Sequence, residues 1–523
     1  MKNKFIYLSV LVVAGLVSCE PEFENPVSAD YSAGDADFSS YVAVGNSLTA
    51  GYMDGTVYKS GQANSFPNLL AQQFAQVGGG AFTQPSFDDD VNNLGGLQGL
   101  TATRLVINAA VGAPQPLAGS STITLAPQAK AYNNMGVPGA KSFHLLVPGY
   151  GNIAGLPSGQ ANPYFVRHAT SPAATVLGDA VSKNPTFFTN WIGANDVLSY
   201  ATSGGVGVDQ TGNMNPTSYG GNDITDPTVF AGVYNLIING GTSPVFGNVT
   251  GLAQNGAKGV VATIPSVTSI PFFTTVPYNP LSSALIGGDA NVDALNAQLY
   301  GPLKQALTAF GAGSRINLLS KTEGNPLLIK DESLPNLSAQ LTAAFTPTLG
   351  APTAAFYGSV FGQARHATAD DLVLLTTKGV IGTAPTGVPA PLDKYGVTYP
   401  LQDQHILIPS EQDAIAAAVA SYNSSIKTIA AAKGLAVADM NVIMKQLTSG
   451  LRADNGTLYT ADYFSGGASE FKVLFSLDGV HPNARGYAVI ANEIIKVIKS
   501  HYIAKLPVLN PNNYPGIHIV PSN

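Results

Sequence analysis

Short apolar runs alternate along this chain with segments in which apolar residues recur every three or four positions. The runs predict buried strands, which lie at 41–44, 187–192, 259–265 and 434–438. The periodic segments predict helices, which lie at 66–74, 291–310, 410–429 and 487–498. Strands that alternate with helices indicate an α/β domain built on a parallel sheet.

Two of the predicted helices carry start signals. Ser410 with Asp413 resembles a capping box, in which side chains bond the free N–H groups of the first turn. Pro482 suits the first turn of the last helix, because proline has no N–H to leave unpaired there. We therefore expect His481 to stand at the mouth of an anchored helix.

Four long segments lack such a pattern and are rich in small, polar or turn-forming residues. They span about 80–130, 145–182, 200–250 and 268–400. The chain contains 56 glycines and 35 prolines, and only 11% of its residues are charged, against about 25% in an average domain. Loops of this length are usually functional or disordered. We interpret them as insertions, with the largest as a cap, in one domain at 39–505.

The two ends of the chain differ from this domain. A basic start precedes an almost wholly apolar stretch that is too short for a mature membrane span. The Leu-Val-Ser-Cys boundary that ends at Cys19 resembles a bacterial lipobox, which implies a signal peptide at 1–18 and lipidation of Cys19. An acidic tether is expected at 19–38, and a tail rich in proline and asparagine at 506–523. The alternative is a plain secretory signal that ends by chance in the only cysteine.

A serine follows the first predicted strand at a break in the pattern. Gly45 and Asn46 end the strand, and Ser47 comes next. Because α/β folds bind ligands outside the carboxyl ends of their strands, Ser47 lies where chemistry is expected. Serine is a poor nucleophile at neutral pH and needs a base hydrogen-bonded to its hydroxyl.

Asp478 and His481, near the other end of the chain, supply the two parts that such a serine needs. Histidine suits the role of base because its pKa lies near the working pH. A carboxylate fixes the histidine tautomer and stabilises the imidazolium. One short loop therefore carries both candidates.

Two further segments are candidates for an oxyanion hole. The turn-rich stretch at 134–139 can bring a backbone N–H close to a substrate, and Gly136 and Gly139 are the two choices within it. Asn195 follows a predicted strand, and its amide can donate to a developing oxyanion. The loss of one such donor typically costs about 10²–10³ in rate.

In this order, the four segments resemble the SGNH (GDSL-type) hydrolases, a family named for its serine, glycine, asparagine and histidine. The resemblance implies an α/β fold with a flavodoxin-like parallel sheet flanked by helices. It implies Ser47 as nucleophile, with His481 as base and Asp478 as its orienting acid. It implies an oxyanion hole made of the Ser47 and Gly139 N–H groups and the Asn195 amide. It implies no metal or organic cofactor.

Each of these residues also has an ordinary structural interpretation. The serine suits a cap, the asparagine and Gly139 suit turns, Asp478 suits an Asp-Gly turn, and His481 suits a surface position. One such motif alone is weak evidence, whereas four in family order favour catalysis. The common form of the family has aspartate at the position of Asn46, and the change removes a charge beside the serine.

The predicted activity is ester hydrolysis by a lipid-anchored esterase or lipase of the bacterial cell envelope, at the outer membrane on its periplasmic or cell-surface side. A carbohydrate acetylesterase, a thioesterase and an acyltransferase share such a site, and a non-catalytic lipoprotein that binds glycans or a partner is the alternative of another class. The expected partners are a small-molecule, lipid or glycan ester and the membrane. A net charge of −7 without a basic run gives nucleic-acid binding no support, and the remaining histidines form no metal pattern. Arg365 and His366 are the candidates for polar pocket contacts in the largest insertion.

Overall fold

A parallel five-stranded sheet forms the centre of the molecule. The computed structural model describes residues 30–520, except residue 111 and the segments 454–455 and 467–469. The strand order is β13-β8-β5-β1-β4. The strands are β1 Tyr41–Gly45, β4 Asn134–Gly136, β5 Phe187–Trp191, β8 Lys258–Ala262 and β13 Ala436–Ala438. Numbered along the chain and read from β4, this order is 2-1-3-4-5, which is compatible with a flavodoxin-like sheet. The predicted parallel α/β architecture is confirmed.

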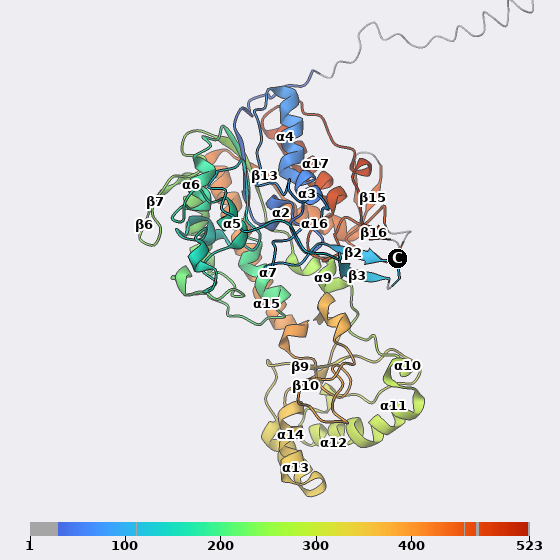
Figure 1. The fold of residues 1–523 in the computed structure, drawn as a ribbon. Helices are drawn as coiled ribbons and strands as arrows, with labels where there is room; N and C mark the ends of the chain where they lie inside the picture. Colours follow the sequence, from blue (N-terminus) through green and yellow to red (C-terminus); the bar gives the residue numbers. More distant parts are fainter. Residues whose placement is uncertain (1–29, 111, 454–455, 467–469, 521–523) are drawn as a thin grey trace, which may run out of the picture.

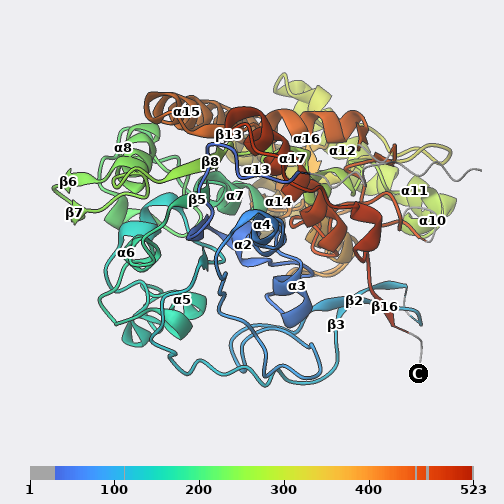
Figure 2. The same cartoon turned by 90° about the horizontal axis from the view of Figure 1, so that it is seen from above.

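Helices cover both faces of this sheet, so its strands are buried on both sides. Val42 and Val44 pack on one face, with apolar residues of α6, α8 and α15, whereas Tyr41 and Ala43 pack on the other, with residues of α4 and α17. These helices are α4 Phe66–Phe74, α6 Val176–Val181, α8 Pro227–Asn239, α15 Pro409–Lys433 and α17 Ala484–His501. Figure 2 shows α6 and α8 on one side of the sheet and α4 and α17 on the other. The sheet thereby fixes the loops at its ends between two cores.

The long helix α15 begins differently from the prediction. Pro409 is its first residue, and the Glu411 carboxylate accepts the N–H of Ile408 at 2.8 Å. This cap therefore lies two residues before the Ser410–Asp413 pair that the sequence predicts. Glutamate reaches back to the N-cap N–H, as in a capping box, although the N-cap residue itself is apolar.

Two of the segments predicted as insertions contain core helices. Besides α6, the segment 145–182 holds α5 Pro163–His168, and the segment 200–250 holds α8. Asp226 caps α8 and accepts the N–H groups of Thr228 and Val229 at 2.8 and 2.9 Å. The Asp-Pro start of α8 is a helix signal, but the glycine- and asparagine-rich sequence before it conceals the helix in a compositional average.

The predicted tether and tail are both partly packed on the body. The N–H of Ser32 donates to the carbonyl of Lys505 at 3.0 Å, and the Phe38 ring stacks on Phe74 with ring centroids 4.0 Å apart. In the tail, β16 Ile519–Val520 pairs with β2 Leu105–Asn108, which pairs with β3 Ala113–Pro116. Residues on both sides of 39–505 therefore contact the body. The predicted signal peptide and Cys19 lie outside the described residues.

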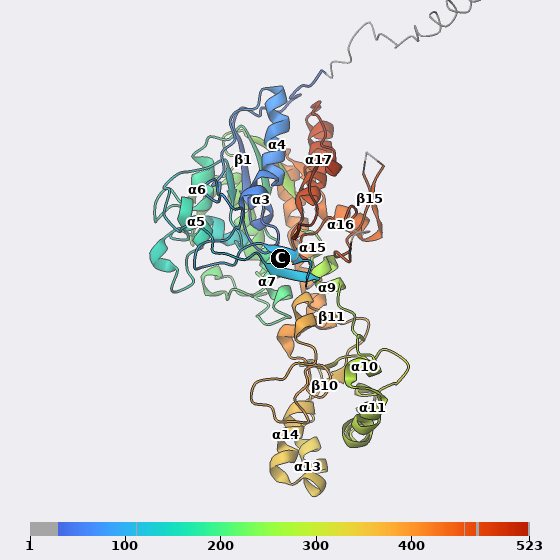
Figure 3. The same cartoon turned by 45° about the vertical axis from the view of Figure 1, so that its right-hand side comes forward.

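Most of the largest insertion forms a lobe that projects from the body (Figures 1 and 3). The lobe has its own hydrophobic core, which runs from Val276 to Ile408. Its main elements are α10 Ser283–Ile286, α11 Asp289–Leu295, α12 Gly301–Ala309, β9 Leu328–Lys330, α13 Ser338–Leu349, α14 Ala351–Phe361 and β10 Ala364–His366. A π-helical turn, Asn296–Tyr300, joins α11 to α12, so the helix predicted at 291–310 is present with an interruption. At the junction with the body, α9 Pro271–Thr274 lies beside β11 Leu372–Val373, which pairs with β12 Ile406–Leu407.

Across the residues that the structure describes, no helix has both the length and the apolar character that a bilayer crossing requires.

Candidate active site

The end of β1 is shaped for a sharp turn. A Cβ atom on Gly45 would lie 2.1 Å from the Thr49 hydroxyl and 2.7 Å from the Trp191 carbonyl oxygen. Only glycine therefore fits there, and the chain turns directly from the strand into a helix.

That helix is α2 Ser47–Ala50, and it presents the candidate nucleophile at its first position. Asn46 caps it, with its side-chain oxygen accepting the Leu48 N–H at 3.1 Å. Asparagine and aspartate are equally good helix caps, so the departure from the common family form keeps the cap and omits the charge. The Ser47 N–H belongs to the first turn and has no acceptor within the helix.

Ser47, His481 and Asp478 form one hydrogen-bonded chain. The Nε2 atom of His481 lies 2.8 Å from the Ser47 Oγ, and its Nδ1 lies 2.9 Å from the Asp478 Oδ2. An ionised carboxylate only accepts, so Nδ1 carries the proton and Nε2 is free to accept the serine proton. Asn483 then caps α17 by accepting the Gly486 N–H at 2.9 Å, so Pro482 precedes the helix instead of entering its first turn.

Asp478 is held as an anion. It accepts the N–H groups of Gly55, Val480 and His481 at 3.1, 2.9 and 2.8 Å, and the Ser476 hydroxyl at 2.9 Å. Burial raises the pKa of Asp478, but His481 and these donors outweigh burial and bring the pKa down to about 2. The carboxylate is therefore charged at any pH at which the histidine works as a base.

A second buried carboxylate, Asp54, joins the nucleophile turn to the histidine loop. Its N–H donates to Ser476 Oγ at 3.0 Å, and its side chain accepts the Leu477 N–H at 3.0 Å and the Tyr58 hydroxyl at 2.7 Å. Burial raises the pKa of Asp54 to about 6, against the lowering effect of those two donors. Asp54 was not predicted from the sequence, although an Asp-Gly pair so soon after the nucleophile marks a turn that needs an anchor.

Asn195 is the first residue of α7 Asn195–Thr202 and follows β5. Its amide nitrogen donates to the carbonyl oxygen of Ala140 at 2.9 Å, and its side chain is almost fully buried. An amide nitrogen carries two hydrogens, so one remains for an oxyanion. The same contact places the loop of Gly139 beside Asn195.

The two candidate glycines of that loop differ in their environment. The Gly136 N–H donates to Asn134 Oδ1 at 3.0 Å, and a Cβ on Gly136 would lie 2.3 Å from the Ala50 nitrogen. Gly136 therefore packs against α2. Gly139 has a φ of 78°, and within the described part of the chain its N–H has no protein acceptor. Gly139 remains the candidate donor, although it is not among the residues that line the two cavities at the triad.

A network of buried hydrogen bonds holds the same loop. Asp196, which follows the candidate oxyanion asparagine, accepts the Ser142 N–H at 2.8 Å and its hydroxyl at 2.7 Å. Burial raises the pKa of Asp196, and the Ser142 donors and the charge of Lys141 oppose that shift. The Lys141 ammonium donates to the Asp223 carbonyl oxygen at 2.6 Å.

These groups gather at the carboxyl edge of the sheet. Ser47 follows β1, Asn195 follows the adjacent β5, and Gly139 follows β4 on the other side of β1. In doubly wound sheets this is the place where the strand order reverses and where ligands bind. The fold therefore brings together residues from both ends of the chain at one site.

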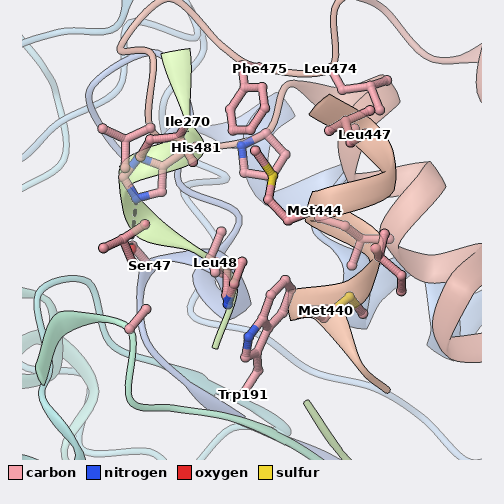
Figure 4. A pocket seen from close by; sticks show the side chains of 18 of the residues that line it. Ser47, Leu48, Trp191, Ile270, Met440, Met444, Leu447, Leu474, Phe475 and His481 are labelled. Carbon is pink, nitrogen blue, oxygen red and sulfur yellow. Dashed lines mark hydrogen bonds between the residues drawn. The ribbon is translucent and has the colours of Figure 1, made fainter. Parts of the chain in front are cut away.

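Two cavities meet at His481. One, of about 870 Å³ with its mouth included, extends from Ser47 into the body (Figure 4). The other, of about 1770 Å³ with its mouth included, lies at the junction with the lobe and is lined by Tyr52, Lys378 and Asp478 among others.

The structure does not bring Arg365 and His366 to this site. Both lie on β10 inside the lobe, and neither lines either cavity. Arg365 binds the carboxylates of Asp331 and Asp371, each at 2.6 Å, and His366 Nδ1 accepts the Asn317 N–H at 3.2 Å. Both side chains therefore find partners within the lobe itself, at Asp331, Asp371 and Asn317.

No family model, curated protein or solved structure was found to match this chain. Within the described residues, no group of three or more His, Cys, Asp or Glu side chains is placed to hold a metal ion.

Proposed function

We propose that this protein is a serine esterase of the SGNH type, which hydrolyses carboxylic esters through an acyl-serine intermediate. The observation that carries the proposal is the hydrogen-bonded chain from Ser47 through His481 to Asp478 at the carboxyl edge of the sheet. A serine, a neutral histidine and an ionised aspartate in this geometry are the parts of an activated nucleophile.

The reaction follows from the positions of the polar atoms. Ser47 Oγ attacks the ester carbonyl while His481 Nε2 takes its proton and then gives that proton to the departing alcohol. Asp478 stabilises the imidazolium formed in between. Water then attacks the acyl-serine while His481 Nε2 takes its proton, and His481 gives that proton to Ser47 Oγ as the carboxylic acid is released. The N–H groups of Ser47 and Gly139 and the amide of Asn195 are the donors for the oxyanion.

The first test is the substitution Ser47→Ala in the purified protein. Because the nucleophile is removed, hydrolysis of a short-chain p-nitrophenyl ester should fall by at least about 10³-fold and labelling by a fluorophosphonate should disappear. Ser158→Ala is the matched control, since Ser158 is exposed and lines neither cavity. Near-wild-type turnover by Ser47→Ala contradicts the proposal. A wild-type protein that neither labels nor hydrolyses any ester points instead to a binding lipoprotein.

The proposed location is the cell envelope, with the chain anchored through lipid on Cys19. The motivation is the basic start, the apolar stretch and the Leu-Val-Ser-Cys boundary. Two or more acyl chains give stable membrane attachment, so the mature protein should be found in the membrane fraction. Mass spectrometry of the mature N-terminus checks this, and an unmodified Cys19 or a fully soluble protein would contradict it.

A further inference from the structure

The smaller cavity at the triad is a pocket without charge. Its lining contains no Asp, Glu, Lys or Arg among the residues that the structure describes. Apart from the Trp191 indole, its polar side chains are Asn46, Ser47, Asn195 and His481. Polar groups therefore stand only where the chemistry is proposed, and the rest of the wall is apolar.

The helix α16 Met440–Ser449 contributes four residues to the apolar wall, which are Met440, Ile443, Met444 and Leu447. Met440, Met444 and Leu447 recur at helical spacing on its buried face. In Figure 4, Ser47 and His481 stand at one end of the pocket and these α16 side chains at the other, with Trp191 between Leu48 and Met440. The pocket therefore extends away from the reacting atoms into the hydrophobic body.

We propose that this pocket binds the acyl group of the ester, and that this group is an apolar chain longer than butyryl. The inference rests on the proposed function and names its substrate class. A sugar or a charged group would lose its hydrogen bonds to water in this pocket and find no partners for them. An acetyl group would leave most of the apolar wall in contact with water or empty. A hydrocarbon chain covers that wall, and each methylene removed from water favours binding.

The larger cavity takes the alcohol part of the ester. It reaches the same His481, but it is wider and includes the exposed Lys378 of the junction. The alcohol must leave before water attacks the acyl-serine, and a wide cavity at the surface permits that exit. The acyl chain stays bound between the two steps, which suits the narrower pocket. The preferred ester is therefore amphipathic, with an apolar acyl chain and a polar alcohol.

The test is a series of p-nitrophenyl esters from acetate through butyrate and octanoate to palmitate, used below their micellar concentrations. Burial of one methylene favours binding by up to about fourfold, so kcat/KM for octanoate should exceed that for acetate by at least about 50-fold. A series of alkyl acetates, in which only the alcohol lengthens, should show a much weaker dependence on chain length.

Variants of α16 locate the chain. Met444→Trp fills the pocket, so kcat/KM for octanoate should fall at least about tenfold while that for acetate changes less than about threefold. Val442→Trp is the matched control, because Val442 lies on the exposed face of the same helix. Met444→Ala enlarges the pocket and should move the optimum to longer chains, and it keeps the proposal testable if the tryptophan variant does not fold.

The outcomes separate this inference from the proposed function. Acetate hydrolysed as well as octanoate, with intact fluorophosphonate labelling, overturns the acyl pocket and leaves the esterase standing. An unchanged chain profile in folded Met444→Trp, or a dependence seen only in the alkyl acetate series, also overturns it. Absence of labelling and of hydrolysis with every ester overturns the proposed function itself.

Discussion

At the scale of single residues, the site depends on where negatively charged side chains lie. Asp478 carries a charge because five hydrogen-bond donors converge on it, and its pKa is lowered to about 2. Asn46, beside the nucleophile, caps its helix without adding a charge. The charge of Asp478 lies at Nδ1 of His481, whereas Ser47 lies at Nε2. That arrangement stabilises the imidazolium without repelling the oxyanion that forms on the serine side.

Asn195 should act on the transition state. In Asn195→Ala we expect kcat to fall by about 10²–10³ with KM changed by less than about threefold, because an oxyanion donor acts on charge that develops during the reaction. Steady-state kinetics with one ester measure both constants. A change in KM alone would make Asn195 a substrate-binding or structural residue that acts through its bond to Ala140.

Asp54 should make the stability of the protein depend on pH. Its pKa is about 6 in the folded protein and 3.8 in the reference state, so the protonated form is favoured by folding. The contribution is present below about pH 4 and is lost as the pH rises through about 6. Relative to wild type, Asp54→Asn should therefore gain up to about 3 kcal/mol in unfolding free energy between those pH values. Urea unfolding at several pH values checks this, and a difference that stays constant with pH would contradict it.

At the scale of elements, local sequence patterns predicted those strands and helices whose signals lie within their own residues. The strands β1, β5, β8 and β13 and the helices α4, α15 and α17 follow from apolar runs and helical periodicity. The strand β4 is only three residues long and begins with asparagine, so it has no such pattern. The strand β16 exists because it pairs with β2, far away along the chain, and no local signal encodes that pairing.

The residues of the candidate site also divide into those that short motifs predict and those that only the folded structure reveals. Ser47, Asp478 and His481 were predictable because each sits in a short motif, and the fold places them in contact. The α16 wall of the acyl pocket was not predictable, because Met440 and Met444 at helical spacing look the same in sequence whether they fill a core or line a cavity. Only the position of α16 beside the triad shows that these methionines line a cavity.

At the scale of the whole molecule, the body lines both cavities, and the junction with the lobe contributes to the larger one. The acyl pocket lies within the body, and from the largest insertion only Ile270, at its very start, lines it. The larger cavity is lined from the insertion by Phe272, Thr275 and the turn at 375–379. The lobe beyond the junction has its own core, and none of its residues at 277–371 or 381–404 lines either cavity. The junction is therefore placed to affect which alcohols enter, and not the chemistry or the acyl chain.

Removal of the lobe tests that division. Val276 bridges Val373, and the Thr377 hydroxyl donates to the His405 carbonyl oxygen at 2.7 Å, so the chain ends at both cuts lie close together. Short linkers replacing 277–371 and 381–404 should therefore leave the junction intact. We expect fluorophosphonate labelling and the preference among acyl chains to persist, because Ser47 and the α16 wall are untouched. Discrimination between small and bulky alcohols should persist as well, because Phe272, Thr275 and the turn at 375–379 remain at the larger cavity. Circular dichroism establishes that the shortened protein is folded, and an ester panel with one acyl group and graded alcohols measures the discrimination. Loss of labelling in the folded protein would mean that the lobe helps to build the catalytic centre. A changed preference among alcohols or among acyl chains would mean that the lobe beyond the junction shapes a substrate cavity.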